Sequence, residues 1–164
     1  MKTFILGVIL TLVALAAAAY VAAHFGFINM RADQKPSSFE TTFAAGAMDA
    51  SVGRHAPALT NPIAPTDANL LAGMTIYQEK CAQCHGDPQM PDSTLAEYPP
   101  APQFLSEPAD MPENQNFYII QHGIRLTAMP GWKESLSADQ IWKLVTFLSH
   151  MEKLPPAVEQ QWKK

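Results

Sequence analysis

The sequence predicts an all-α protein in which three main helices follow an N-terminal apolar helix. Apolar residues recur at helical spacing in three separate segments, each with a cap or a stop signal. No stretch alternates apolar and polar residues as a half-buried strand would. Most of the fourteen prolines lie in residues 57–65 and 88–112, where long regular elements cannot run.

The N-terminal helix is predicted from the uninterrupted apolar run between Phe4 and Val21. A helix of about 20 such residues spans the hydrocarbon core of a bilayer, so we expect residues 1–28 to be a transmembrane anchor. A cleaved signal peptide, with Ala17 and Ala19 as the small residues before the cut, is the alternative. The anchor is favoured because the run exceeds the roughly 7–15 residues of a signal core.

Residues 29–65 are predicted to be a linker that leaves the membrane. Pro36, Ser37 and Ser38 are typical of such a connection, and the stretch Ala47–Ala56 is able to form a short helix.

The predicted domain occupies residues 66–154. Its first helix begins with Thr66 as N-cap and Asp67 in the first turn, and it runs to about Ala82. Its second helix runs from Asn114 to Gly123, where the glycine provides a C-terminal stop.

The last helix has the clearest start, because Ser137 and Gln140 form a capping box. Pro155-Pro156 ends this helix and leaves residues 155–164 as a C-terminal tail. Its predicted buried stripe consists of Ile141, Leu144, Val145 and Leu148.

The segment Cys81-Ala82-Gln83-Cys84-His85 has the C-x-x-C-H pattern of covalent haem attachment. One helical turn places the two sulfurs where the two vinyl groups of a haem can be reached, with His85 beneath the iron. A zinc site needs four ligands, and no second Cys or His pair follows at metal-ligand spacing. A disulfide between Cys81 and Cys84 is the alternative, but it gives His85 no role. We therefore predict one haem c, held by Cys81 and Cys84 and ligated by His85.

A methionine is expected on the other side of the iron, because a thioether opposite a histidine raises the potential of an electron carrier. We choose Met129, which lies just after the second helix and is followed by Pro130. Met90 lies only five residues after His85 and would struggle to cross the haem plane. Met111, in a loop, is the serious rival.

Residues 66–154 resemble a class I cytochrome c, in particular the single-haem, membrane-anchored bacterial members. The C-x-x-C-H motif and a Met-Pro pair at this separation are a specific signal, whereas the helix positions alone are weak. Ala128 departs from the pattern, since a glycine is commoner there. The residues that carry the resemblance are Gly73, Tyr77, Cys81–Gly86, Tyr98–Pro102, His122–Arg125, Met129–Trp132, Leu144 and Phe147.

The resemblance implies a cytochrome c-like domain of three main helices around one covalent haem. It implies that Gly73 and Tyr77 cross the last helix near Leu144 and Phe147. The linker from Asp49 to Pro65 also resembles those homologues, which implies that it packs on the domain.

The resemblance also implies roles around the haem. The backbone carbonyl of Pro102, or that of Pro100, should accept a hydrogen bond from Nδ1 of His85. Either Arg125 or Trp132 should approach a haem propionate.

These residues together predict a single-electron carrier rather than an enzyme, because a haem closed by His85 and Met129 has no open position for a substrate. Its expected partners are a redox donor, a redox acceptor and the membrane. The resemblance implies a single pass through a bacterial inner membrane, with the haem domain in the periplasm. The net charge of −4, without a basic patch, argues against nucleic acid. The alternatives are a haem subunit of a respiratory or oxidase complex, or a haem enzyme or sensor with a labile sixth ligand.

Overall fold

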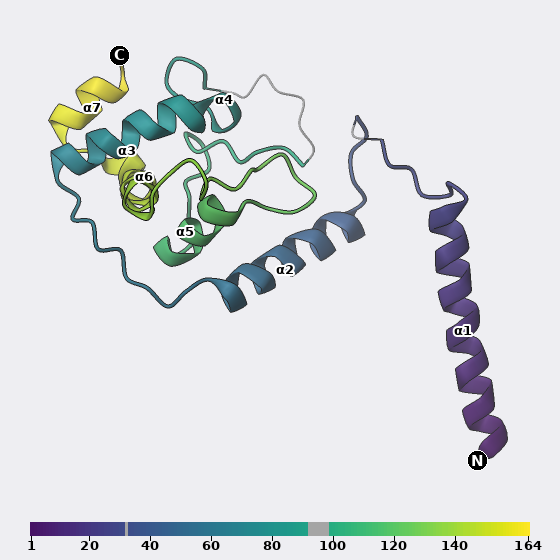
Figure 1. Ribbon diagram of the computed structural model, residues 1–164. Helices are drawn as coiled ribbons and strands as arrows, with labels where there is room; N and C mark the ends of the chain where they lie inside the picture. Colours follow the sequence, from purple (N-terminus) through teal and green to yellow (C-terminus); the bar gives the residue numbers. More distant parts are fainter. Residues whose placement is uncertain (32, 92–98) are drawn as a thin grey trace. The chain divides into compact units, whose positions relative to one another are not determined.

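The computed structural model describes residues 1–31, 33–91 and 99–164. Over these residues the chain forms seven α-helices, one short 3-10 helix and no strand, so the predicted all-α fold is confirmed (Figure 1). The chain divides into two compact units, Met1–Gln34 and Lys35–Lys164.

The first unit contains α1 (Lys2–His24), a helix of 23 residues with no buried side chain. Its length and apolar composition suffice to cross a membrane, and a signal sequence near the N-terminus has the same two properties. The anchor and the signal peptide therefore both stay predictions.

In the second unit, α3 (Asp67–Lys80) and α6 (Ala138–His150) cross to form the core. Gly73 permits the crossing, because a Cβ there would meet the carbonyl of Lys143 and lie 2.8 Å from the Cβ of Phe147. The predicted contact of Gly73 with the last helix is thus confirmed. The large side chains buried completely in this core include Leu70, Tyr77, Ile141, Leu144, Val145 and Phe147.

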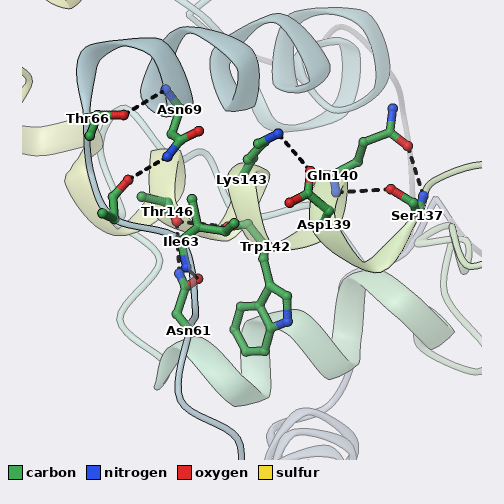
Figure 2. A network of polar contacts seen from close by, with 11 residues as sticks. Asn61, Ile63, Thr66, Asn69, Ser137, Asp139, Gln140, Trp142, Lys143 and Thr146 are labelled. Atoms are coloured by element: carbon green, nitrogen blue, oxygen red, sulfur yellow. Dashed lines mark hydrogen bonds and ion pairs between the residues drawn. The ribbon is translucent and has the colours of Figure 1, made fainter.

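The starts of both core helices agree with the sequence. The hydroxyl of Thr66 accepts a hydrogen bond from the backbone N–H of Asn69 at 3.3 Å. The side chains of Ser137 and Gln140 each accept from the backbone N–H of the other, at 3.3 and 2.9 Å (Figure 2). Both predicted caps are confirmed, and each satisfies N–H groups that the first helical turn leaves without a partner.

Helix α2 (Ser38–His55) is longer than the helix predicted over Ala47–Ala56. The side chain of Ser37, expected in a linker, accepts from the backbone N–H of Glu40 at 3.1 Å and so caps the helix. A serine followed three residues later by a glutamate is a helix start, and this signal outweighs the preceding proline.

The C-terminal half of α2 packs on the domain. Val52 is buried there, and α2 contacts α5 (Glu113–His122). The segment 56–66 then returns to α3, and the side-chain amide of Asn114 donates to the carbonyl of Pro57 at 3.0 Å.

Asn61 fastens this returning segment to α6 (Figure 2). Its Nδ2 donates to the hydroxyl of Thr146 at 2.9 Å, while its Oδ1 accepts from the backbone N–H of Ile63 at 3.0 Å. Further along, Asn69 Nδ2 donates to the carbonyl of Ala64 at 2.9 Å. The segment before α3 is therefore held by side chains from three helices, α3, α5 and α6.

Helix α7 (Pro156–Trp162) follows η1 (Met151–Lys153) and packs against α3. Residues 155–164, predicted as a C-terminal tail, thus contain a helix, and its Val158 and Trp162 are buried. A proline at the first helical position is favourable, because its fixed φ suits the helix and its missing N–H is not needed there.

Candidate functional site

The two cysteines lie where α3 ends. Cys81 terminates α3, and the four-residue helix α4 (Ala82–His85) follows at once, so Cys81, Cys84 and His85 share about one helical turn. Within the described part of the chain neither thiol is in a disulfide. Burial raises the pKa of the Cys81 thiol to about 12, and the neighbouring Cys84 adds to the rise. Before a haem is attached, Cys81 is therefore a protonated thiol at neutral pH.

The imidazole of His85 is held by the segment 101–104. Its Nδ1 lies 2.9 Å from the carbonyl oxygen of Pro102, so Nδ1 donates the hydrogen bond and Nε2 is the nitrogen whose lone pair can bind a metal. The ring also stacks on that of Phe104, with centroids 4.4 Å apart and planes within 5°. Of the two carbonyls that the resemblance implied, those of Pro102 and Pro100, the structure has the bond to Pro102.

Three successive backbone carbonyls around His85 also accept hydrogen bonds from residues outside α4. The three bonds are Gln103 Nε2 to Cys84 O at 3.0 Å, Phe104 N–H to His85 O at 3.1 Å, and the Tyr77 hydroxyl to Gly86 O at 2.7 Å. A helix end leaves such carbonyls without intrahelical partners, so these donors complete the C-terminus of α4.

Met129 lies on the loop that follows α5. The helix ends at Gly123, whose φ is +71°, and the predicted glycine stop is confirmed. The N–H of Ile124 donates to the carbonyl of Met129 at 3.1 Å. The hydroxyl of Thr127 donates to the carbonyl of Ile124 at 2.8 Å and accepts from the N–H of Met129 at 3.1 Å. The loop is therefore closed on itself at its base.

Two glycines bring the ends of this loop against α5. A Cβ on Gly123 would lie 2.6 Å from the carbonyl oxygen of Met129, and a Cβ on Gly131 would lie 2.8 Å from the carbonyl group of His122. Only residues without a side chain allow this close approach, so the position of Met129 depends on both glycines.

The other candidates lie in different settings. Met111 is half-buried just before α5, and Met90 lies in a tight turn whose backbone pairs with Asp87 at 2.9 and 3.0 Å. Arg125 is exposed on the Met129 loop, and Trp132 is half-buried against the core.

The cysteine motif and the Met129 loop meet the same hydrophobic cluster. Cys81, Phe104, Met129 and Trp132 all pack, partly buried, at its edge. Two thiols on about one helical turn and a neighbouring imidazole with its tautomer fixed are the groups that covalent haem attachment uses. The residues present therefore fit a covalently attached haem.

A comparison with family models matches residues 68–148 to cytochrome c oxidase, cbb3-type, subunit III. The match marks these residues as a c-type cytochrome domain, consistent with the class I kind that the sequence resembles. No curated protein and no solved structure matches the chain. Tyr98, one residue of the resemblance, lies outside the described residues.

The c-type cytochrome domain indicates the general function of the chain. A c-type cytochrome domain implies haem c as cofactor, redox proteins as partners and haem-based electron transfer, which indicates an electron carrier rather than an enzyme.

Gln103 and Phe104 contact the backbone near His85, and the sequence did not predict either contact. Gln103 and Phe104 lie next to Pro102, but their partners Cys84 and His85 are 19 residues earlier in the chain. No local periodicity reports a contact over that separation. The only available signal was that both residues directly follow Pro102, whose role the resemblance implied.

Proposed function

We propose that the chain carries single electrons through one haem c, bonded to Cys81 and Cys84, with His85 and Met129 as the axial ligands. The observation that supports this most strongly is the hydrogen bond from His85 Nδ1 to the Pro102 carbonyl. It fixes the tautomer in which Nε2 can bind iron, immediately beside two thiols. When bound, the haem supplies an iron that changes oxidation state by one electron.

The chain's own residues would set the properties of that iron. The Pro102 carbonyl raises the basicity of His85, because the hydrogen bond draws the Nδ1 proton away from the ring. The thioether of Met129 favours reduced iron and so raises the potential. The closed base of the Met129 loop would keep this ligand in place.

We further propose that α1 is an uncleaved anchor that crosses the bacterial inner membrane once, with the domain in the periplasm. The apolar length of α1 supports this. A protease added to spheroplasts should digest the domain, and intact α1 should remain in the membrane fraction. A mature protein that starts near Ala19 and is released in soluble form would support the signal peptide instead.

The attachment is tested by expressing the full chain with a c-type maturation system. Wild-type protein should retain one haem per chain after denaturation, measured by intact mass and by haem-dependent peroxidase staining of a denaturing gel. The double variant Cys81→Ser with Cys84→Ser should retain none. Exported wild-type chain without covalent haem would contradict the proposal.

A second candidate function is that of a haem subunit in a respiratory or oxidase complex. The description of the matching family, a subunit of a cbb3-type oxidase, supports it. Purification from the native membrane in mild detergent separates the two, because a subunit should elute with other chains at fixed stoichiometry. A carrier should elute alone.

A haem enzyme or sensor with a labile sixth ligand is the remaining alternative. It predicts high-spin iron in the purified protein and rapid binding of carbon monoxide by the reduced form. The carrier predicts low-spin iron and slow binding.

A further inference from the structure

Three hydrogen bonds from other parts of the chain hold the backbone around His85. The carbonyls of Cys84, His85 and Gly86 would otherwise point from the end of α4 without intrahelical partners. Each instead accepts from another part of the chain, at 3.0, 3.1 and 2.7 Å in that order.

Two of these donors are side chains, and they hold the carbonyls on either side of His85. Gln103 Nε2 donates to Cys84 O and also to the carbonyl of Ala101 at 2.8 Å, so one amide joins α4 to the segment that carries Pro102. The Tyr77 hydroxyl reaches Gly86 O from α3.

The backbone at Gly86 is closely surrounded by other atoms. Its φ is +78°, and a Cβ on it would lie 2.8 Å from the carbonyl oxygen of Pro91 and 3.2 Å from Gln103 Oε1. The chain therefore turns tightly directly after His85, with the Gln103 side chain and the Tyr77 hydroxyl both beside the turn.

The side chain of Tyr77 is itself held by aromatic neighbours. It is completely buried, and its ring contacts those of Phe147 and Trp162, each with centroids 5.6 Å away. Trp162 belongs to α7, which lies beyond the residues that match the cytochrome family. A helix outside the matched region thus supports the side chain that holds Gly86.

We propose that Tyr77 and Gln103 are positioning residues for His85: they hold the backbone on both sides of it, so that its imidazole keeps the hydrogen bond to Pro102. The proposal rests on the proposed function, in which His85 is the iron ligand. Without either side chain, the backbone of α4 moves relative to the segment 101–104, and the Nδ1 hydrogen bond becomes longer and weaker. A weaker bond makes the imidazole a poorer donor, which disfavours oxidised iron.

The test uses the full-length holoprotein with the variants Tyr77→Phe and Gln103→Leu. Each variant keeps the size of the side chain and removes the donor. We expect each to keep covalent haem, to shift the midpoint potential upward, and to exchange the His85 Nδ1 proton with solvent several-fold faster in NMR spectra. A side chain that acts only through overall stability would leave the midpoint potential of the folded holoprotein unchanged.

Two matched controls separate positioning from stability. Val52→Ala removes buried apolar atoms in α2, and Gln78→Leu changes an exposed glutamine on α3, the helix of Tyr77. Val52→Ala should lower stability to denaturant, and both should keep the wild-type midpoint potential.

The outcomes distinguish this proposal from the proposed function. Wild-type haem protein whose two variants both show the wild-type potential and proton exchange would overturn the positioning role and leave the electron carrier intact. Potentials that move equally in the variants and in Val52→Ala would also overturn it. Wild-type chain that never acquires covalent haem would overturn the proposed function and this proposal together. If Tyr77→Phe does not fold, Gln103→Leu alone decides, because Gln103 is not completely buried.

Discussion

The surroundings of His85 and those of Met129 are built in opposite ways. His85 lies on a short helix whose end is held by the Tyr77 hydroxyl, nine residues before Gly86, and by Gln103, 19 residues after Cys84. The His85 ring itself donates to Pro102, 17 residues later in the chain. Met129 lies on a loop whose hydrogen bonds connect Ile124, Thr127 and Met129, all within six residues. One proposed ligand depends on long-range contacts, the other on local closure.

The difference teaches which disturbances each ligand should tolerate. Long-range contacts disappear when the helices that bring them move, so the His85 side should respond to changes in the core and in α7. Local closure needs only its own turn and the glycines beneath it, so the Met129 side should respond to changes of one or two atoms within the loop. Four substitution experiments test this contrast.

Trp162→Ala should have the largest effect, because a buried tryptophan is deleted from beside Tyr77 and Phe147. We expect a loss of about 3–5 kcal/mol in the free energy of unfolding, measured with denaturant. The His85 Nδ1 proton should exchange faster in this variant, while methionine coordination persists. Loss of methionine coordination with an unchanged His85 proton would contradict the contrast.

Gly123→Ala should disturb the Met129 loop. The alanine would have a positive φ and its Cβ would lie 2.6 Å from the Met129 carbonyl oxygen, which together cost roughly 2–5 kcal/mol. We expect the loop to open and methionine coordination to be lost from a chain that still carries haem, as seen by optical spectroscopy.

Gly53→Ala is the matched control, since the nearest atom that a Cβ there would meet among the described residues is Gln115 Nε2, at 4.0 Å. Gly53 lies in α2, where alanine should stabilise the helix by about 0.5–1 kcal/mol. A similar spectrum for both glycine variants would show that the Met129 loop does not need the close approach.

Thr127→Val removes the hydroxyl that bridges Ile124 and Met129 and leaves the shape of the side chain nearly unchanged. We expect a loss of about 1–2 kcal/mol in stability. Azide or imidazole should displace Met129 faster than in wild type, measured by stopped-flow absorbance. Gln103→Leu should leave that rate unchanged, and an equal acceleration in both variants would refute the separation of the two sides.

The smallest effect at neutral pH should be that of Tyr77 ionisation. Burial, followed by the nearby Cys81 and Asp87, raises the pKa of Tyr77 far above its usual value. In the unfolded chain the phenol loses its proton near pH 10, whereas the folded chain retains it. The stabilisation is therefore complete below about pH 10 and is lost as the pH rises further. The free energy of unfolding, measured with denaturant from about pH 9 to about pH 11, should fall more steeply with pH for wild type than for Tyr77→Phe.

The sequence was informative wherever a structural signal is local. The caps at Thr66 and Ser137, the stop at Gly123 and the small residue at Gly73 each follow from a residue type at a defined helical position. The C-x-x-C-H motif is local too, because its chemistry needs only one helical turn.

Where one residue is compatible with two structures, or where a contact joins residues far apart in sequence, the predicted element was too short or was missed. Pro156 was predicted to end the last helix, whereas α6 ends at His150 and Pro156 takes the first position of α7, with Val158 and Trp162 following at helical spacing. Ser37 belongs to a linker-like run and also caps α2. Gln103 meets Cys84 only through the fold, so neither residue's neighbours in sequence indicate the contact.

The proposed coordination of iron by His85 and Met129 is tested most directly by the absorption spectrum of the oxidised wild-type holoprotein and of Met129→Ala. We predict that wild type shows the weak long-wavelength band of methionine-to-iron coordination, and that Met129→Ala lacks it while retaining covalent haem. A band that survives in Met129→Ala and disappears in Met111→Ala would assign the ligand to Met111. No band in the wild type would contradict coordination by any methionine.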